Sequence, residues 1–307
     1  MQDNFFWWRM KRKVIQIAES TQLISLPRKW CLEHSIKKGA ELEVEEQGSR
    51  IIVSTAGEAP LQRAALKMST KEKFLRRPIK SLYILGIDEL TIEFDDPAVL
   101  SLIQEETKEL VGFEVVSHTQ YGCVIKSVVS AVDNEFDNIL RRILLLLVET
   151  ARDSLSAIQS KNYAALDEIE QREEINNKLT AFCLRILNKR GYHDHHKLTA
   201  MYGLVCMLEY VGDEFKYLTR ALKNIKEPLR KEIIEKYQEA CMLMQKFYDI
   251  TYKFTVDSLY EFKMLRVKIN DEGLALLRKS KGVDNEILHY AIRIAEKLHH
   301  GTVFISA

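Results

Sequence analysis

The sequence predicts a mainly α-helical protein that begins with a small β-rich domain, and three observations lead to this fold class. From residue 133 onward, apolar residues recur at spacings of three and four, which is the period of amphipathic helices. Between residues 12 and 54, short stretches alternate between apolar and polar residues, as in half-buried strands. Only 12 Gly and 5 Pro occur among 307 residues, as expected for a helix-rich chain.

Composition limits the class of protein. The length allows two or three domains, and a net charge of +1 at pH 7 indicates neither a uniformly basic chain nor an acidic tail. Five cysteines without a CxxC pair predict a reducing compartment. The densest apolar stretches, Phe5–Trp8 and Ile143–Val148, are far shorter than the ~20 residues that span a bilayer. We therefore expect a soluble, cytoplasmic protein without membrane insertion, in which Phe5–Trp8 pack on the first domain or touch a membrane or a partner.

Residues 9–55 are expected to form the first domain. The predicted elements are strands over Lys13–Ile17 and Gln22–Leu26, a short helix opened by Pro27 over Arg28–His34, and strands over Glu41–Glu45 and Arg50–Val53. A domain of so few residues does not easily bury a core by itself, so dimerisation is expected.

Two half-motifs in this domain are similar to the SpoVT/AbrB family of swapped-hairpin DNA-binding domains. Ser20–Lys29 matches the turn and the Thr-Ile-Pro run of that family, and Ile36–Leu42 matches its Lys/Pro-Gly-Asp step. The turn lacks the family's glycine, and Ala40 stands where Asp is usual. The resemblance implies a swapped-hairpin β domain that forms a homodimer and binds DNA.

A local excess of positive charge favours the same function. Residues 1–40 hold eight Lys or Arg against three acids, a balance of +5, and such a surface attracts phosphates. Four acids between Glu41 and Glu46 would repel DNA if they shared the basic face. The residues expected to contact DNA are Arg9, Lys11, Arg12, Lys13, Arg28 and Lys29.

Residues 66–129 are predicted to form a small α+β unit that follows a linker at Ala56–Leu66. The predicted elements are a helix over Thr70–Leu85 kinked at Pro78, a strand over Leu90–Phe94, a helix from Asp96 to Leu110, and strands over Gly112–Ser117 and Cys123–Val129. The unit contains no motif that indicates chemistry.

Residues 132–305 are predicted to form a helical body. Helices are expected over about 133–160, 163–189 and 199–222, then from Pro228 into the 250s, with two more separated near Gly282. In the third of these helices, one apolar stripe runs along the whole length. Glu209 and Asp213 lie four residues apart and therefore share a face, roughly 40° apart, with Gly212 between them.

The run Leu208–Asp213 resembles the Leu-Glu-Arg-Ile-Gly-Asp signature of the phosphate-uptake regulator (PhoU) family. The resemblance implies two three-helix repeats, over 132–224 and 227–305, in which ExxxD motifs bind metal. Segments like 66–129 join an AbrB-like domain to a PhoU-like domain in archaeal proteins, so an archaeal-type layout is implied. The alternative for the acidic pair is a solvated face of an amphipathic helix.

The metal ligands implied by this resemblance are Glu209, Asp213, Glu173 and Asn176 in the first repeat and Glu296 in the second. Oxygen ligands converging at short range would hold iron, zinc or magnesium, chiefly in the first repeat. Arg172–Asn176 is echoed by Arg266–Asn270, and both segments begin with Arg where the family usually has Asp. These arginines would instead pair with the acidic residues or hold an anion.

Histidine-containing segments offer further candidates. In the loop His193–His196, we expect Asp194 to cap a helix, with metal ligation as the alternative. Glu286–His289 and Glu296–His299 copy the ExxH spacing of di-iron bundles, but both lie on one helix, whereas a di-iron site draws them from facing helices. The sequence contains no recognisable catalytic motif or glycine-rich phosphate loop, so no enzyme activity is expected.

These patterns together predict a regulator of phosphate uptake in which a DNA-binding head joins a sensing body. The expected partners are DNA, a second copy of the chain, and a phosphate-transporter ATPase or a signalling protein. Two alternatives remain: an adaptor of a phosphate transporter whose head only dimerises, and a metal-binding helical bundle.

Overall fold

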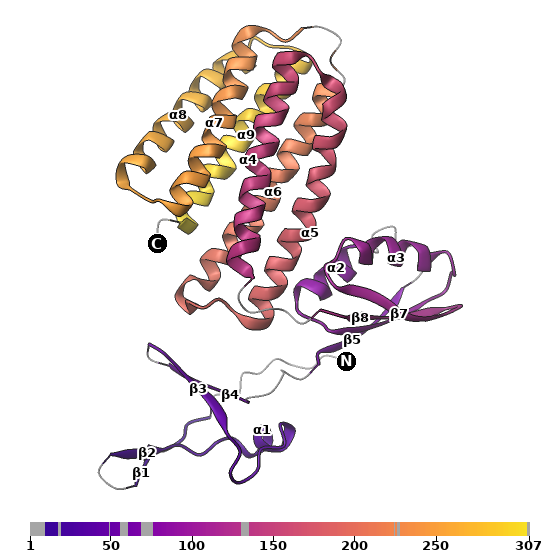
Figure 1. Ribbon diagram of the computed structural model, residues 1–307, viewed down its shortest axis with the longest axis vertical. Coiled ribbons are helices and arrows are strands. Elements are labelled where there is room, and N and C mark those ends of the chain that lie inside the picture. The colour runs from indigo at the N-terminus through magenta and orange to yellow at the C-terminus, as the bar shows by residue number, and fades with distance from the viewer. Residues whose placement is uncertain are drawn as a thin grey trace. The chain divides into compact units, whose positions relative to one another are not determined.

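The computed structural model describes residues 10–17, 20–48, 50–55, 61–68, 76–129, 135–223, 225 and 228–305. The chain forms two compact units, Met1–Pro60 and Leu61–Ala307 (Figure 1). Arg9 and the aromatic cluster Phe5–Trp8, both singled out in the sequence, lie outside the described residues.

The first unit consists of two separate β-hairpins and a short helix. Its elements follow the predicted order: β1 Ile15–Ile17, β2 Thr21–Leu23, α1 Arg28–Glu33, β3 Leu42–Gln47 and β4 Arg50–Thr55. β1 pairs antiparallel with β2 and β3 with β4, but the two hairpins share no sheet. None of the side chains described in this unit is buried, and apolar residues such as Ile15 and Ile51 lie exposed.

A four-stranded sheet opens the second unit. The elements here are β5 Arg63–Met68, α2 Arg76–Ile84, β6 Glu89–Phe94, α3 Val99–Lys108, β7 Phe113–Thr119 and β8 Gly122–Ser127. The strand order is β5-β6-β8-β7, with β5 parallel to β6 and the other neighbours antiparallel. Leu90 and Ile92 of β6 are fully buried in a cluster with α2 and α3, whereas Thr91 and Glu93 face outward.

The linker predicted over Ala56–Leu66 is wrong in its last part, because β5 begins at Arg63. The partner of β5 is β6, which lies beyond α2 in the chain, so no local signal marked the pairing. Pro78, predicted to kink a longer helix, lies in the first turn of α2, where proline is tolerated. The start of that predicted helix, residues 70–75, lies outside the described residues.

Six long helices follow in the described part of the chain. They are α4 Phe136–Ser160, α5 Leu166–Arg190, α6 Leu198–Lys223, α7 Lys231–Tyr252, α8 Val256–Leu277 and α9 Val283–Ile305, with short 3-10 turns at Tyr163–Ala165 and His195–Lys197. Their bounds agree closely with the periodicity of the sequence, and α5 ends at Gly191 as expected. No helix in the described ranges has the length and apolar character needed to cross a membrane.

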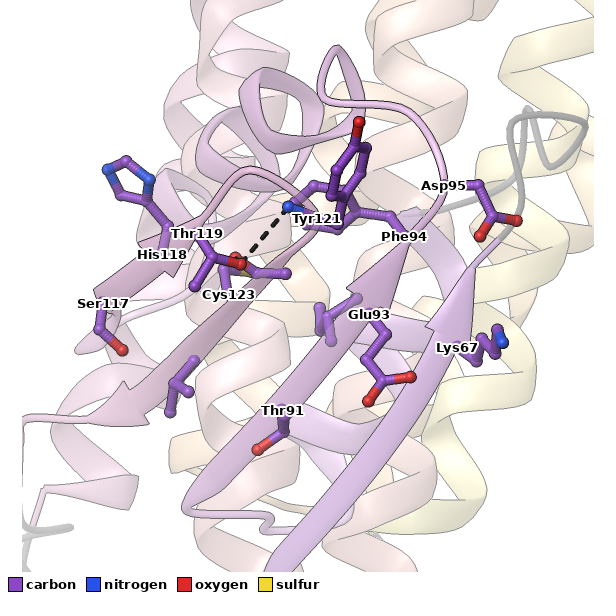
Figure 2. Close-up of a pocket in the computed structure, with 13 residues that line it drawn as sticks. Lys67, Thr91, Glu93, Phe94, Asp95, Ser117, His118, Thr119, Tyr121 and Cys123 are labelled. Atoms are coloured by element: carbon purple, nitrogen blue, oxygen red, sulfur yellow. Dashed lines mark hydrogen bonds between the residues drawn. The ribbon is translucent and has the colours of Figure 1, made fainter.

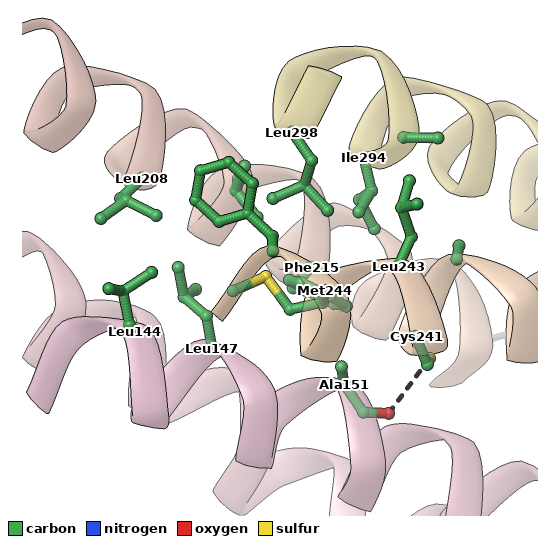
Figure 3. Packing of buried hydrophobic residues seen from close by; sticks show 14 of the residues in the cluster. Leu144, Leu147, Ala151, Leu208, Phe215, Cys241, Leu243, Met244, Ile294 and Leu298 are labelled. Carbon is green, nitrogen blue, oxygen red and sulfur yellow. Dashed lines mark hydrogen bonds between the residues drawn. The ribbon is translucent and has the colours of Figure 1, made fainter. Parts of the chain in front are cut away.

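The six helices bury one continuous apolar core. α4, α5 and α6 pack on one another, α7, α8 and α9 do likewise, and the two sets meet where α6 lies against α9 and α4 against α7. Figure 3 shows the meeting point, with Leu147 of α4, Phe215 of α6, Met244 of α7 and Leu298 of α9 in one cluster. Because the cluster spans both sets, neither set buries its apolar surface without the other.

One buried arginine fixes the α+β unit to α5. Arg185 is 3% exposed, and its guanidinium donates to the carbonyl oxygens of Tyr83 at 2.7 Å and Ile87 at 2.8 Å. It also donates to the Asp88 carboxylate at 2.9 Å and lies over the ring of Tyr83. Lys189, one turn further along α5, donates to the same carboxylate.

The hydrogen bonds and charges around Asp88 keep its carboxyl group ionised. Burial by itself would raise the pKa of Asp88, but hydrogen bonds from Lys189 and from the Gln62 N–H, with the charge of Arg185, outweigh it. The pKa of Asp88 therefore lies below its usual value. A carboxyl whose pKa is lower in the folded state stabilises the fold above the unfolded pKa and loses that contribution as the pH falls.

Replacing Asp88 by Asn is expected to lower the free energy of unfolding by about 3 kcal/mol at pH 7, because it leaves the Arg185 guanidinium buried without its counter-charge. The difference from the wild-type protein should shrink below about pH 4, where Asp88 of the unfolded wild-type chain is itself protonated. Urea unfolding at several pH values measures both effects.

The neighbouring substitution Glu89→Gln is the matched control. Glu89 pairs with Arg63 at 3.7 Å and Lys126 at 3.0 Å on the open face of the sheet, so its loss should change stability by less than about 1 kcal/mol. Equal effects of the two substitutions would contradict the role given to Arg185.

Candidate functional site

A lysine pairs with each acidic residue of the Leu208–Asp213 motif. Glu209 accepts a hydrogen bond from Lys80 Nζ of α2 at 2.7 Å, so this carboxylate connects the helical body with the α+β unit. Asp213, one turn further along α6, accepts a hydrogen bond from Lys216 at 2.6 Å. The two carboxylates therefore face two different cations.

Lys216 bridges two of the predicted metal ligands. Its Nζ lies 2.6 Å from Oε1 of Glu173 on α5 and 2.6 Å from Oδ1 of Asp213 on α6. Burial by itself lowers the pKa of this ammonium group, but its hydrogen bonds to the two carboxylates reverse the effect, so the pKa is raised. Lys216 therefore stays protonated and places a positive charge between the two acids.

Asn176 lies beside this cluster and is 1% exposed. A Cβ atom at Gly212 would lie 2.4 Å from Asn176 Nδ2, so the glycine makes room for the amide between α5 and α6. Neither side-chain polar atom of Asn176 has a hydrogen-bond partner among the described residues. Gly212 thus allows a side chain of the neighbouring helix to lie close to the backbone of α6.

The second set of helices pairs its acid with an arginine. Glu296 on α9 accepts two hydrogen bonds from Nη2 of Arg266 on α8, at 2.7 and 2.8 Å. Arg172, the counterpart of Arg266 in the first set, pairs instead with Asp153 of α4 at 2.8 Å. Both arginines therefore form salt bridges, but only Arg266 reaches a predicted ligand.

These contacts do not fit a metal centre. A hard metal ion needs several carboxylate oxygens that converge on one point, whereas Glu173 and Asp213 converge on an ammonium group. Glu209 and Glu296 each face a cation of their own. Over the described ranges, no three His, Cys, Asp or Glu side chains gather in a way that would hold a metal. Ligation of iron, zinc or magnesium stays a prediction that the donor set does not support.

The two lysines were not predicted from the sequence, although one of them was recognisable. Lys216 follows Asp213 by three residues, a spacing that places the two side chains together on a helix. Lys80 gave no such signal, because its contact with Glu209 joins positions 129 residues apart.

The predicted DNA-contacting cations of the first unit are exposed: Lys11, Arg12, Lys13, Arg28 and Lys29. Lys29 pairs with Glu33 one turn later at 3.7 Å, and the other four make no ion pair with a described residue. The first three precede β1 and the last two begin α1, so they come from two separate segments.

A cleft of about 510 Å³ lies over the outward face of the sheet, lined by residues of all four strands (Figure 2). In the β7–β8 turn beside it, the Tyr121 N–H donates to Thr119 Oγ1 at 3.4 Å. Burial raises the pKa of the Cys123 thiol to about 11, so this thiol stays protonated at neutral pH and is a poor nucleophile.

The structure places the histidine-containing segments singled out in the sequence in different surroundings. The Asp194 carboxylate accepts a hydrogen bond from the His196 N–H at 3.1 Å, which confirms the predicted cap. His193 lies 4.0 Å from Asp137, and its ring packs against that of Tyr192. In the ExxH segment at Glu296–His299, Arg266 occupies the carboxylate.

Comparisons with known proteins give one weak likeness. No family model matches the chain, and no curated protein does so either. Among solved structures, the phosphate transport system regulatory protein PhoU from Streptococcus pneumoniae is 14% identical and aligns with a TM-score of 0.47. The alignment covers 56% of this chain and 92% of that one.

Replacing Lys216 by Met is expected to lower the free energy of unfolding by about 2 kcal/mol at pH 7, because two partly buried carboxylates lose their common partner. Thermal unfolding with and without zinc or magnesium checks a second consequence: added metal should stabilise the Lys216→Met variant more than the wild-type protein.

Lys223→Met serves as the control, since Lys223 bridges Asp167 and Glu170 at 2.5 Å in a more exposed position. Its loss should change stability by less than about 1 kcal/mol and should leave the response to metal unchanged. Strong stabilisation of the wild-type protein by a stoichiometric metal would contradict the role given to the Lys216 ammonium.

Proposed function

We propose that the chain is a cytoplasmic regulator of phosphate uptake, with a sensing helical body and a DNA-binding head at residues 9–55. The Leu208–Asp213 motif supports the first part. Its acids lie on α6, and Glu209 contacts Lys80 of the α+β unit. A change at this motif would therefore alter the contact between the helical body and the α+β unit. The packing of six helices in two sets of three is consistent with the same proposal.

The observation that carries the DNA-binding part is a head with exposed cations and no buried side chain among its described residues. Apolar side chains lie exposed on both hairpins, among them Ile15, Val44 and Ile51. Burial of such surface contributes about 25 cal/mol per Å², so pairing with a second head is the natural source of its stability. Pairing also doubles the number of cations available to the phosphates of a duplex.

The body is proposed to act by binding a protein, either a phosphate-transporter ATPase or a signalling protein. Its thiols are poor nucleophiles, because burial raises the pKa of Cys183 and Cys241 above the usual value. Two acids of α5, Glu170 and Glu173, are paired with lysines and an arginine of α6. Such a surface suits recognition better than proton transfer.

A second candidate is an adaptor of a phosphate transporter whose head only dimerises. The exposed acids Glu41, Glu43 and Glu46 on and beside β3 favour it, because they would repel DNA from that strand. Under this candidate, DNA binding is weak and independent of sequence.

Charge reversal at Lys13 and Arg28 together is expected to weaken DNA binding by the full chain about tenfold or more, because it removes phosphate contacts. Each lost contact should also lower the salt dependence of log K by about one. Fluorescence anisotropy over a salt series measures both effects, with a promoter fragment from a phosphate-transport operon compared with random DNA.

Lys281→Glu is the control, since Lys281 is an exposed lysine of the second unit, and it should leave DNA binding unchanged. Equal, weak binding to both DNAs that vanishes near physiological salt would assign the function to the protein contacts of the body.

A further inference from the structure

α8 has a second apolar face that no described residue covers. Five large apolar side chains on it are 41–76% exposed: Val256, Tyr260, Met264, Val267 and Leu274. At 100° per residue they fall within an arc of about 80°, and they extend over about 27 Å of helix. We call this set the α8 stripe.

The face of α8 opposite the stripe is the one that packs in the body. Phe262, Ile269 and Gly273 are buried there, and α8 lies at the outer edge of the helices in Figure 1. A helix that is apolar on two sides is usually buried on both. The stripe therefore indicates an interaction surface.

The charged residues of α8 fall into two groups, those paired with neighbouring helices and those at the stripe. Glu261, Arg266, Lys268 and Glu272 all form ion pairs with α7 or α9. Lys263 and Asp271, which border the stripe or lie within it, form no ion pair with a described residue. These two opposite charges are therefore available to a partner.

We propose that the α8 stripe pairs with the α8 stripe of a second copy of this chain, antiparallel, around a two-fold axis at Val267. In this arrangement, a residue n positions before Val267 in one copy meets the residue n positions after Val267 in the other copy. Tyr260 and Leu274 lie seven positions to either side, and Lys263 and Asp271 lie four positions to either side. Both an apolar pair and an ion pair thus form twice.

The symmetry of the sequence around one residue is what selects a second copy over an unrelated partner. A two-fold contact uses the same patch on both subunits, so its patch must be complementary to itself. A parallel pair would place Lys263 against Lys263 and Asp271 against Asp271, and like charges in contact are repulsive. The antiparallel arrangement turns the same charges into attractions.

Cysteine cross-linking of the full chain tests this contact directly. In the Val267→Cys variant, the two introduced thiols meet at the two-fold axis, within the 4.4–6.8 Å Cα separation that a disulfide needs. Mild oxidation should give a covalent dimer at least about tenfold faster than in the Val303→Cys variant. Val303 is 71% exposed on α9, outside the stripe, and wild-type protein gives the background of the native thiols.

Charge reversal in the Val267→Cys background tests the orientation. Lys263→Asp should slow cross-linking about tenfold at low salt, and the double reversal Lys263→Asp with Asp271→Lys should restore it. Cross-linking at Val267→Cys no faster than at Val303→Cys overturns the proposal. Failure of the double reversal to restore the rate overturns the antiparallel pairing. Cross-linking of Val267→Cys to a different protein in cell extract, without a dimer, assigns the stripe to that partner and overturns it as well.

Discussion

The guanidinium of Arg185 is the contact on which the arrangement of the second unit depends. It emerges from α5 and donates to the backbone at the end of α2, to the turn that follows, and to Asp88 just before β6. A single side chain thus fixes the helix, the turn and the strand relative to the body. The contact between Lys80 and Glu209 follows from it, because α2 carries Lys80. The candidate site therefore extends over two parts of the unit.

Much of the fold follows from local patterns, and the exceptions share one cause. The long helices were predictable because each carries its apolar stripe within its own sequence, as Thr199–Leu222 does for α6. β5 was not, since its pairing with β6 depends on residues beyond α2. α8 differs from the other helices, because its apolar residues lie on two faces and its sequence therefore indicates no single inward side.

The acidic residues of the site were predictable from the sequence, but the cations that pair with them were not. Glu209 and Asp213 lie on one helix, as their spacing indicates, and Gly212 allows a neighbour to approach. The sequence does not reveal which cation meets each carboxylate, because Lys80 and Arg266 reach across from other helices. A motif of acids therefore does not by itself define the chemistry of a site, because the cations that pair with the acids come from other helices.

The core shared between the two sets of helices also has a consequence for biosynthesis. Phe215 and Leu208 of α6 are buried in the same cluster as Ile294 and Leu298 of α9, which begins only at Val283. At ~5–20 residues per second, the ribosome needs on the order of several seconds after completing α6 to synthesise α9. Until then the nascent chain displays an uncovered apolar ridge. α9 thus completes the core that both sets of helices share, and a chain truncated before it should be a substrate for chaperones and proteases.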